Sequence, residues 1–272
     1  MNQRSLSALL VVLVSVLASP GCGEEASEAK EKPVELVVYA ATSTRDALLS
    51  LERAYERDHA VDLIFNFGSS GDLSNQIVAA AKADVFVSAD DEEMDEVQAA
   101  GLVASGTRRP LLSNRLVVVE PADGPSIFST PFDPSQLADD RVELPSLASV
   151  ESVPAGRYAR AWLEERGVWN DVSGRVLPGV DVRAALAAVE SAGAQAGIVY
   201  RTDAARSAKV RVVHAVPPEE GPEISYPVAV LAGRPGEKAA RAFVDFLASP
   251  GARAAFEQVG FVFLPTAQAS AK

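Results

Sequence analysis

The chain has 272 residues, of which 48% are hydrophobic, and its 37 acidic and 25 basic side chains give a formal net charge of -12 at pH 7. Such a charge repels nucleic acid, and a single cysteine excludes an internal disulfide framework. The length allows one large or two modest domains, which must be stabilised by an apolar core alone.

The N-terminus has the pattern of a secretory signal. Arg4 lies in a short polar head and is followed by an apolar run, residues 6–18, that is too short for a permanent membrane span. Cys22 comes directly after the small residues that end this segment, and "ASPGC" resembles a bacterial lipobox. The alternative is an incidental or buried thiol. We predict that residues 1–21 are a signal peptide and that a lipid on Cys22 anchors the exported protein to the membrane.

Residues 22–33 are predicted to form a solvated tether, because "GEEASEAKEKP" lacks large apolar residues and closes on a proline. The folded part is expected to begin near Val34, and residues 267–272 are expected to form a tail. Removal of the signal peptide leaves 24 basic and 37 acidic side chains, a net charge of -13.

The first half of the folded part alternates aliphatic runs with stretches of helical period. Strands are predicted at 35–40, 61–67, 84–89 and 115–120, and helices at 43–58, 72–83 and 90–101. The first helix has one apolar face, formed by Ala47, Leu48, Leu51, Ala54 and Tyr55. Near-continuous Val, Ile and Leu strands between such helices indicate an α/β architecture with parallel sheets covered on both faces.

A second series follows a proline-rich connection. It predicts strands at 141–147, 175–180, 196–201, 209–216 and 224–231, helices at 156–167 and 181–193, and two closing helices at 236–249 and 251–260. Pro227 in the last strand favours an edge or crossover position, because proline cannot donate to a β-ladder.

The turns from strand to helix are the candidate ligand sites, because ligands of open α/β sheets bind beyond the carboxyl ends of the strands. These turns are "AATST", with Ser43 or Thr44 as N-cap, "FGSSGD", "SVPAGRY" and "PGVDVRAAL". Each offers free N–H groups and the positive end of a helix dipole, so that four of them could surround one small anion. Ordinary helix capping is the alternative explanation of each turn taken alone.

Eight short motifs carry a resemblance to a known family. In chain order they are "VVYAATST", "FGSSGDLSNQI", "ADVFVSAD", "LLSNRLVVV", "VPAGRYAR", "DVRAALAAVE", "GIVYRTDA" and "YPVAVL". From about Glu35 to Phe263 the chain resembles the periplasmic molybdate-binding proteins, the ModA family. The resemblance implies a two-lobed periplasmic solute-binding fold of type II, in which each lobe is a mostly parallel sheet flanked by helices. Lobe I would comprise residues 34–115 and 226–266, lobe II residues 116–225, and the two crossings between them a hinge.

The resemblance also implies a set of oxyanion-binding residues. Ser43 and Ser70 would donate from the first lobe, and the Ala155 N–H, the Val182 N–H and the Tyr200 hydroxyl from the second. Many converging hydrogen bonds suit a buried dianion, and neutral donors avoid the cost of burying ammonium or guanidinium groups beside it. Gly68 and Gly71 would leave room for the anion to approach the backbone.

One segment departs from the family pattern. Before "VPAG" the family usually has Asp-Pro after a glycine, whereas residues 148–152 read "ASVES". The shape of this loop, and with it the position of the Ala155 N–H, is therefore open at the level of sequence.

Other polar groups receive structural interpretations. The acidic run from Asp90 to Glu93 is predicted to be a solvated helix start, since it lacks the ligand pattern of an EF-hand loop. Arg183 is expected to support a neighbouring carboxylate or to line the cleft. Trp162 and Trp169 are expected in the core.

The resulting functional hypothesis is a binding protein and not an enzyme. It would bind molybdate, and also tungstate, without a cofactor or a metal cation, and deliver it as a monomer to an ABC transporter permease. Sulfate or another tetrahedral oxyanion is the alternative within this class, and phosphate is disfavoured because it carries protons. An exported serine hydrolase would require His59 or His214 beside Ser43 or Ser70, and a surface sensor is a third possibility.

Overall fold

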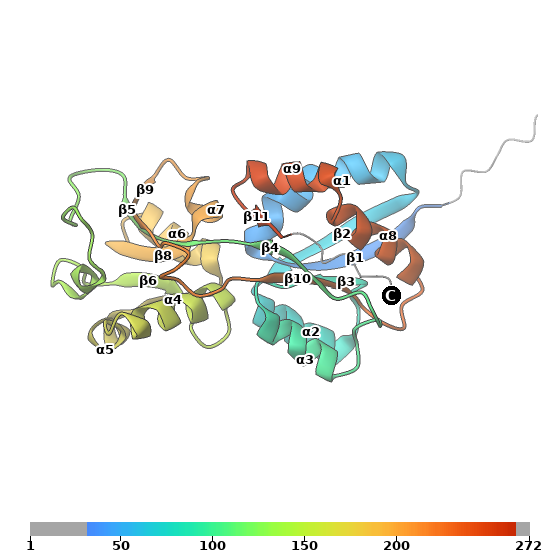
Figure 1. The fold of residues 1–272 in the computed structure, drawn as a ribbon, viewed down its shortest axis with the longest axis horizontal. Helices are drawn as coiled ribbons and strands as arrows, with labels where there is room; N and C mark the ends of the chain where they lie inside the picture. Colours follow the sequence, from blue (N-terminus) through green and yellow to red (C-terminus); the bar gives the residue numbers. More distant parts are fainter. Residues whose placement is uncertain (1–31, 265–272) are drawn as a thin grey trace, which may run out of the picture. The chain divides into compact units, whose positions relative to one another are not determined.

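The first of two sheets has six strands in the order β11-β4-β10-β3-β1-β2 (Figure 1). The computed structural model describes residues 32–264. The strands are β1 (Val34–Ala41), β2 (Val61–Gly68), β3 (Val85–Val87), β4 (Arg109–Ser113), β10 (Tyr226–Val230) and β11 (Val262–Phe263). The predicted signal peptide, Cys22 and the C-terminal tail lie outside the described residues. Within them, no helix combines the length and hydrophobicity that crossing a membrane requires.

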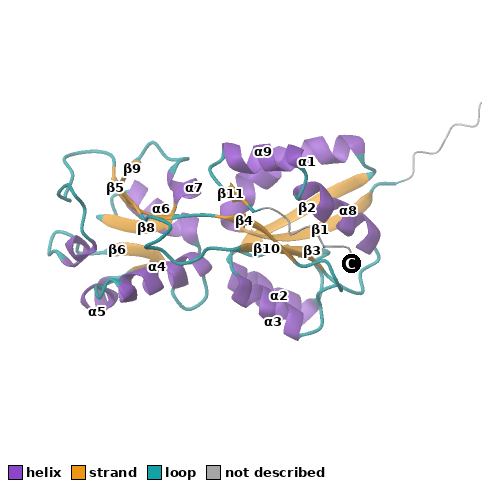
Figure 2. Ribbon diagram, viewed as in Figure 1, coloured by secondary structure: helices purple, strands orange, loops and turns teal. Residues whose placement is uncertain are grey.

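Helices cover both faces of this sheet (Figure 2). One face packs in the main apolar cluster against α1 (Arg45–Asp58), α8 (Glu237–Leu247) and α9 (Pro250–Gln258), through residues such as Leu48, Phe243 and Phe256. A separate cluster on the other face joins Phe86 of β3 to α2 (Ser70–Ala80) and α3 (Asp91–Ala99). Because both faces are buried, the interior strands read as continuous apolar runs.

The second sheet has five strands in the order β7-β6-β8-β5-β9. They are β5 (Leu116–Pro121), β6 (Pro145–Ala148), β7 (Leu177–Gly179), β8 (Ala196–Tyr200) and β9 (Val210–Ala215). The helices of this part are α4 (Pro154–Glu165), α5 (Trp169–Val172), α6 (Val182–Glu190) and α7 (Arg201–Ala204), with 3-10 turns η2 (Pro134–Ala138) and η3 (Ser173–Arg175). Trp162 of α4 is fully buried and Trp169 packs against the core.

The sheets are mixed, which corrects the prediction that they are mostly parallel. β1 pairs in parallel with β2 and β3, but β10 is antiparallel to both β3 and β4. In the second sheet β6 is parallel to β7 and β8, whereas β5 is antiparallel to β8 and β9. A parallel pairing needs a crossover connection such as a helix. β5 and β10 instead enter their sheets directly from the other sheet, so they run against their neighbours.

Pro227 occupies an interior strand and not an edge, because β10 lies between β4 and β3. The pairing of β10 with β4 shifts register between Tyr226 and Pro227, and this irregularity accommodates the missing N–H. The crossover interpretation holds, since β10 follows the return of the chain from the second sheet. β4 and β11, which the periodicity analysis did not predict, are short and add only a few apolar residues.

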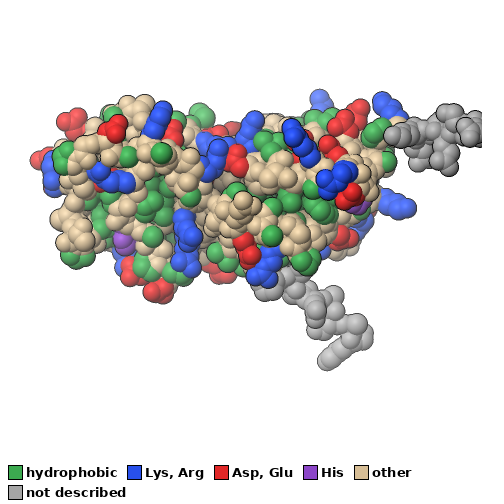
Figure 3. Space-filling view, turned by 90° about the horizontal axis from the view of Figure 1, so that it is seen from above, with side chains coloured by type: hydrophobic (Ala, Val, Ile, Leu, Met, Phe, Trp, Pro, Cys, Tyr) green, Lys and Arg blue, Asp and Glu red, His purple; other side chains and the backbone are tan. Residues whose placement is uncertain are grey.

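Charged side chains of both signs are interspersed over the face shown in Figure 3. Many arginines are paired with carboxylates, for example Arg108 with Asp91 and Arg211 with Glu120. These arginines therefore compensate part of the acidic charge locally.

Candidate anion site

A cavity lies where helix N-termini from the two sheets converge on the end of β8. It has about 220 Å³ of atom-free space, part of which is open to solvent. All five residues predicted from the sequence, Ser43, Ser70, Ala155, Val182 and Tyr200, line it. The other lining residues are Ala41, Thr42, Gly68, Ser69, Ala89, Val153, Pro154 and Asp181.

Ser43 lies in the 3-10 turn η1 (Thr42–Thr44) between β1 and α1 and is 6% exposed. Its Oγ is 3.1 Å from the hydroxyl of Tyr226. It does not cap α1, and Thr44, which occupies the N-cap position, donates its hydroxyl to the Ala41 carbonyl at 2.7 Å instead of capping. Of the two predicted N-cap residues, Thr44 therefore holds that position, but its side chain makes no capping bond. The turn satisfies Thr44 locally and leaves Ser43 facing the cavity.

Ser70 is the first residue of α2, and Ser69 caps this helix by accepting the Asp72 N–H at 3.2 Å. The Ser70 Oγ accepts the Ala89 N–H at 2.9 Å. Because a backbone N–H can only donate, the Ser70 oxygen is an acceptor in this bond and its own proton remains for another partner. Ser70 is thus arranged to donate to a group in the cavity.

Ala155 and Val182 lie in the first turns of α4 and α6, where N–H groups have no acceptor within the helix. The departure from the family pattern before Val153 does not move Ala155 away from the cavity. The Val153 N–H donates to the Ser149 carbonyl at 3.0 Å, which closes the loop and directs the chain into α4. Asp181 caps α6 by accepting the Ala184 N–H at 2.8 Å.

Tyr200 is the last residue of β8 and is 1% exposed. Among the described residues its hydroxyl has no partner in good hydrogen-bond geometry, although the Tyr226 hydroxyl is a neighbour. Burial raises the pKa of Tyr200 well above its ordinary value, so the side chain stays a neutral donor. A buried hydroxyl without a partner costs free energy, which a ligand in the cavity would recover.

The hydrogen-bond donors that line the cavity are neutral. No lysine or arginine is among the lining residues of the described chain, and Asp181 is the one carboxylate, held by its cap bond. The positive potential must therefore come from the N-terminal ends of the surrounding helices.

Gly71 corrects the interpretation of the "GSSG" turn. Gly68 lines the cavity, but Gly71 does not. A Cβ at Gly71 would lie 2.3 Å from the carbonyl oxygen of Ser152, which precedes α4. Gly71 is therefore needed for close approach of the two sides of the site, and not for approach of the anion.

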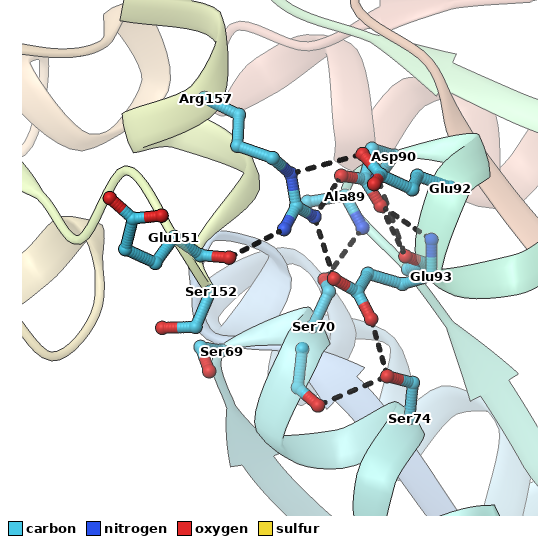
Figure 4. A network of polar contacts seen from close by, with 12 residues as sticks. Ser69, Ser70, Ser74, Ala89, Asp90, Glu92, Glu93, Glu151, Ser152 and Arg157 are labelled. Carbon is cyan, nitrogen blue, oxygen red and sulfur yellow. Dashed lines mark hydrogen bonds and ion pairs between the residues drawn. The ribbon is translucent and has the colours of Figure 1, made fainter. Parts of the chain in front are cut away.

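An ion-pair cluster next to the cavity joins α4 to the start of α3 (Figure 4). We call it the Arg157 cluster: the Arg157 guanidinium contacts Asp90 and Glu93, and its Nε is 3.4 Å from Glu92. Asp90 and Glu93 are each 5% exposed, so the prediction of a solvated helix start holds only for the exposed Asp91 and Glu92. Burial raises the pKa of Asp90, although the bond to Arg157 opposes this shift.

A second cluster, the Asp46 cluster, joins α1 to α6 and α7. Arg183 donates to Asp46 at 2.7 Å, Arg206 also pairs with Asp46, and the Arg183 Nε is 3.5 Å from Asp203. The prediction that Arg183 supports neighbouring carboxylates is confirmed. The Arg157 cluster was not predicted from the sequence, although an arginine directly after "VPAG" and a dense acidic run at a helix start were visible signals.

The two histidines have other partners. The His59 Nδ1 lies 2.9 Å from the Tyr55 carbonyl oxygen, and its ring stacks on Tyr55. The His214 ring stacks on Phe132. Neither lines the cavity, and the described residues contain no cluster of His, Cys, Asp and Glu side chains that could hold a metal ion.

A larger groove lies near the connections between the sheets, with about 920 Å³ of atom-free space that includes open solvent. It is lined mainly by residues 113–116 and 216–224. No helix of the described residues begins there, so the groove lacks the converging N–H groups of the smaller cavity.

Comparison with known proteins decides the family. Residues 36–262 match the model of a family described as bacterial extracellular solute-binding protein. The chain belongs to this family. This solute-binding protein is 35% identical over 236 residues to the molybdate-binding protein ModA of Escherichia coli, covering 84% of the chain and 88% of that protein. It is also 35% identical over 260 residues to Bacillus subtilis YvgL, whose name assigns it provisionally to the ABC transporter substrate-binding lipoproteins, with coverage of 95% and 98%.

The fold of the solute-binding protein agrees with these relatives. The structure of the periplasmic molybdate-binding protein of Azotobacter vinelandii superimposes with a TM-score of 0.74 at 22% identity and covers 85% of this chain and 99% of its own. The predicted α/β fold of a type II periplasmic binding protein is confirmed, with the correction that its sheets are mixed.

Proposed function

We propose that this solute-binding protein binds molybdate, and also tungstate, in the cavity and delivers it to an ABC importer. The observation that carries the proposal is the Tyr200 hydroxyl, a buried donor without a good hydrogen-bond partner among the described residues, on a residue that lines a cavity together with Ser43, Ser70 and several helix N-termini. A tetrahedral dianion accepts hydrogen bonds in several directions and would satisfy these donors together. The name of the Escherichia coli relative supports molybdate as the anion.

Capture would involve a change of distance between the two sides of the cavity. Lobe I, residues 34–115 and 226–266, and lobe II, residues 116–225, would rotate about the segments near Ser113 to Leu116 and near Tyr226 and Pro227. The Arg157 and Asp46 clusters would form as the lobes close, and the closed, loaded form would be recognised by the permease. No covalent chemistry, cofactor or metal cation is required, and the protein would act as a monomer.

Other anions fit the site less well or differ from molybdate by size alone. Sulfate carries the same charge and geometry but is smaller. Hydrogen phosphate carries a proton and needs an acceptor, and among the lining residues the only carboxylate is that of Asp181, one oxygen of which caps α6. A hydrolase is disfavoured because His59 and His214 have partners elsewhere.

The exported protein would be held at the membrane by a lipid on Cys22, after removal of residues 1–21, with residues 22–33 as the tether. The name of the Bacillus subtilis relative, which includes the word lipoprotein, supports this assignment. Cys22→Ser is expected to move the protein from the membrane fraction to the soluble fraction. Membrane association that survives the substitution would contradict lipidation.

The decisive experiment is a thermal-unfolding panel. The chain without residues 1–21 and with Cys22→Ser is stripped of ligand and heated with molybdate, tungstate, sulfate or phosphate at equal concentration. A ligand at a thousandfold excess over its Kd stabilises the native state by about 4 kcal/mol. We expect a large rise in Tm with molybdate and tungstate and a small one with sulfate. Unchanged Tm with all four anions would overturn the proposed function.

Substitution of the serines tests the site. Ser43→Ala and Ser70→Ala are each expected to reduce molybdate affinity by an amount on the order of 1–3 kcal/mol, because a charged acceptor loses a donor. Ser50→Ala is the matched control, since Ser50 lies on α1 and bonds only the Ala47 carbonyl. Calorimetric titration measures the affinities, and equal affinities for all three variants and the unsubstituted protein would refute the site assignment.

A further inference from the structure

Two residues at the crossings between the sheets are hydrogen-bonded to each other behind Ser43. Asn114 lies between β4 and β5, and Tyr226 begins β10. The Asn114 Nδ2 lies 3.4 Å from the Tyr226 hydroxyl, which lies 3.1 Å from the Ser43 Oγ. Tyr226 is fully buried and does not itself line the cavity.

The orientation of the Asn114 amide is fixed by its other bonds. Its Oδ1 accepts the Arg115 N–H at 2.9 Å, and its Nδ2 donates to the Thr202 Oγ1 at 2.9 Å. The Nδ2 group therefore faces Tyr226, and an amide NH₂ can only donate. The Tyr226 oxygen must accept this bond.

The remaining bond joins the Tyr226 and Ser43 hydroxyls, each of which has one proton to donate. Burial raises the pKa of Tyr226, so it remains a phenol with one proton. Accepting from Asn114 takes one of the two lone pairs of the Tyr226 oxygen, and in the arrangement that we infer Tyr226 gives its one proton to the Ser43 Oγ, 3.1 Å away. The Ser43 oxygen then accepts from Tyr226, and its own proton is left for the cavity.

We propose that Asn114 and Tyr226 form a directional hydrogen-bond relay that fixes Ser43 as a donor and thereby selects oxyanions without a proton. Tyr226 is a positioning residue, since it acts on the ligand only through Ser43. The inference rests on the proposed function and extends it by assigning the discrimination between sulfate-type and hydrogen-phosphate-type anions to residues outside the cavity.

The two serines reach the same state by different means. Ser70 is fixed as a donor by a backbone N–H, that of Ala89, whose direction cannot change. Ser43 faces a hydroxyl, which could donate or accept, so its direction depends on Asn114. Ser43 is therefore the one serine of the pair whose role a distant side-chain substitution can alter.

The test compares Tyr226→Phe with Tyr55→Phe. Tyr55 is also a buried tyrosine, but its hydroxyl has no hydrogen-bond partner among the described residues and it does not line the cavity. Affinities for molybdate, sulfate and hydrogen phosphate are measured by calorimetric titration above neutral pH. Sulfate and hydrogen phosphate are similar in size and charge, so the ratio of their affinities reports the effect of the ligand proton.

We expect Tyr226→Phe to lower molybdate affinity about tenfold, because one charge-assisted hydrogen bond to the ligand would be partly lost. The ratio of sulfate affinity to phosphate affinity should fall by a similar factor. Tyr55→Phe is expected to change neither. In a Ser43→Ala background, Tyr226→Phe should have little further effect, because the relay would have no serine to orient. Asn114→Leu, which removes the fixed donor, is a second variant and should shift the ratio in the same direction.

Several results would overturn the relay while leaving the proposed function intact. They are an unchanged ratio in both Tyr226→Phe and Asn114→Leu, equal losses for all three anions, or losses from Tyr226→Phe and Ser43→Ala that simply add. If the unsubstituted protein binds none of the anions, the proposed function and the relay fail together.

Discussion

The anion cavity and the Arg157 cluster lie on neighbouring turns of α2, α3 and α4, yet they are built from opposite kinds of polar group. The cavity is lined by hydroxyls and helix N-termini, with Asp181 as its one carboxylate. The Arg157 cluster contains an arginine and two buried carboxylates, Asp90 and Glu93.

The difference follows from what each region would have to give up: the cavity would release a bound anion, and the Arg157 cluster would come apart when the two sides of the site separate. A full positive charge inside the cavity would hold a dianion strongly but would itself need desolvation, whereas fixed dipoles act without that cost. Between the two sides of the site, charges of opposite sign attract each other, and under the proposed lobe motion they would return to water when the sides separate. The lining of the cavity is thus mainly neutral, and the arginines and their carboxylates lie where the two sides meet.

Gly71→Ala tests the meeting of the two sides without changing any charge or donor. The added Cβ would lie 2.3 Å from the Ser152 carbonyl oxygen, so the two sides could not approach as closely. We expect molybdate affinity to fall about a hundredfold. Without ligand the substitution should not destabilise the fold, because alanine favours helix α2. Gly251→Ala is the matched control, since Gly251 is likewise the second residue of a helix and has free space around it. Equal affinities for the two variants would contradict this role of Gly71.

Arg157→Met removes the cation of the Arg157 cluster and leaves Asp90 and Glu93 without their partner. Because the carboxylates would have to be buried unpaired when the sides meet, we expect molybdate affinity to fall about thirtyfold although Arg157 does not line the cavity. Arg160→Met is the control, because Arg160 pairs with Glu164 on its own helix. Titration calorimetry of both variants measures the effect, and an unchanged affinity for Arg157→Met would separate the cluster from ligand binding.

Asp203→Asn tests the buried carboxylate of the Asp46 cluster. Burial raises the pKa of Asp203 to about 7, against the opposing effect of Arg183 and Arg206. Between the ordinary aspartate pKa and this value the folded protein holds a proton that the unfolded chain releases, so the free energy of unfolding falls as pH rises through this window. Asparagine keeps position 203 neutral at every pH. We therefore expect Asp203→Asn to raise the free energy of unfolding above pH 7 by an amount on the order of 1 kcal/mol, limited by the loss of the pairing with Arg183. Urea unfolding on both sides of the window measures it, and an unaltered pH slope would refute the assignment.

Much of the site could be predicted before the structure was known. Hydrophobic periodicity indicated α1 and α6, and the strand-to-helix turns marked the four segments that offer N–H groups, because such turns depend on neighbouring residues. The choice of Ser43, Ser70, Ala155 and Val182 within these segments came from the family resemblance. Tyr200 required the family resemblance, since an isolated tyrosine at a strand end is indistinguishable from a core residue.

Other features depended on pairs of residues far apart in the chain. The direction of β5 and β10 is set by the connections between the sheets. The requirement for glycine at position 71 is set by the nearby carbonyl of Ser152, which is remote in sequence. The burial of Asp90 and Glu93 could not be inferred from a charged helix start, because burial is decided by Arg157 on another helix.

The sequence by itself determined most of the strands, the longer helices and the N-terminal turns that offer N–H groups, since these follow from local periodicity and capping. Only the tertiary structure decided that the five predicted donors line one cavity, that the arginines near it lie beside it and not in its lining, and that Asn114 and Tyr226 stand behind Ser43. The physical reason is range: capping and amphipathicity act over a few residues, whereas a hydrogen bond between Ser43 and Tyr226 spans 183 positions and exists only after the sheets have folded together.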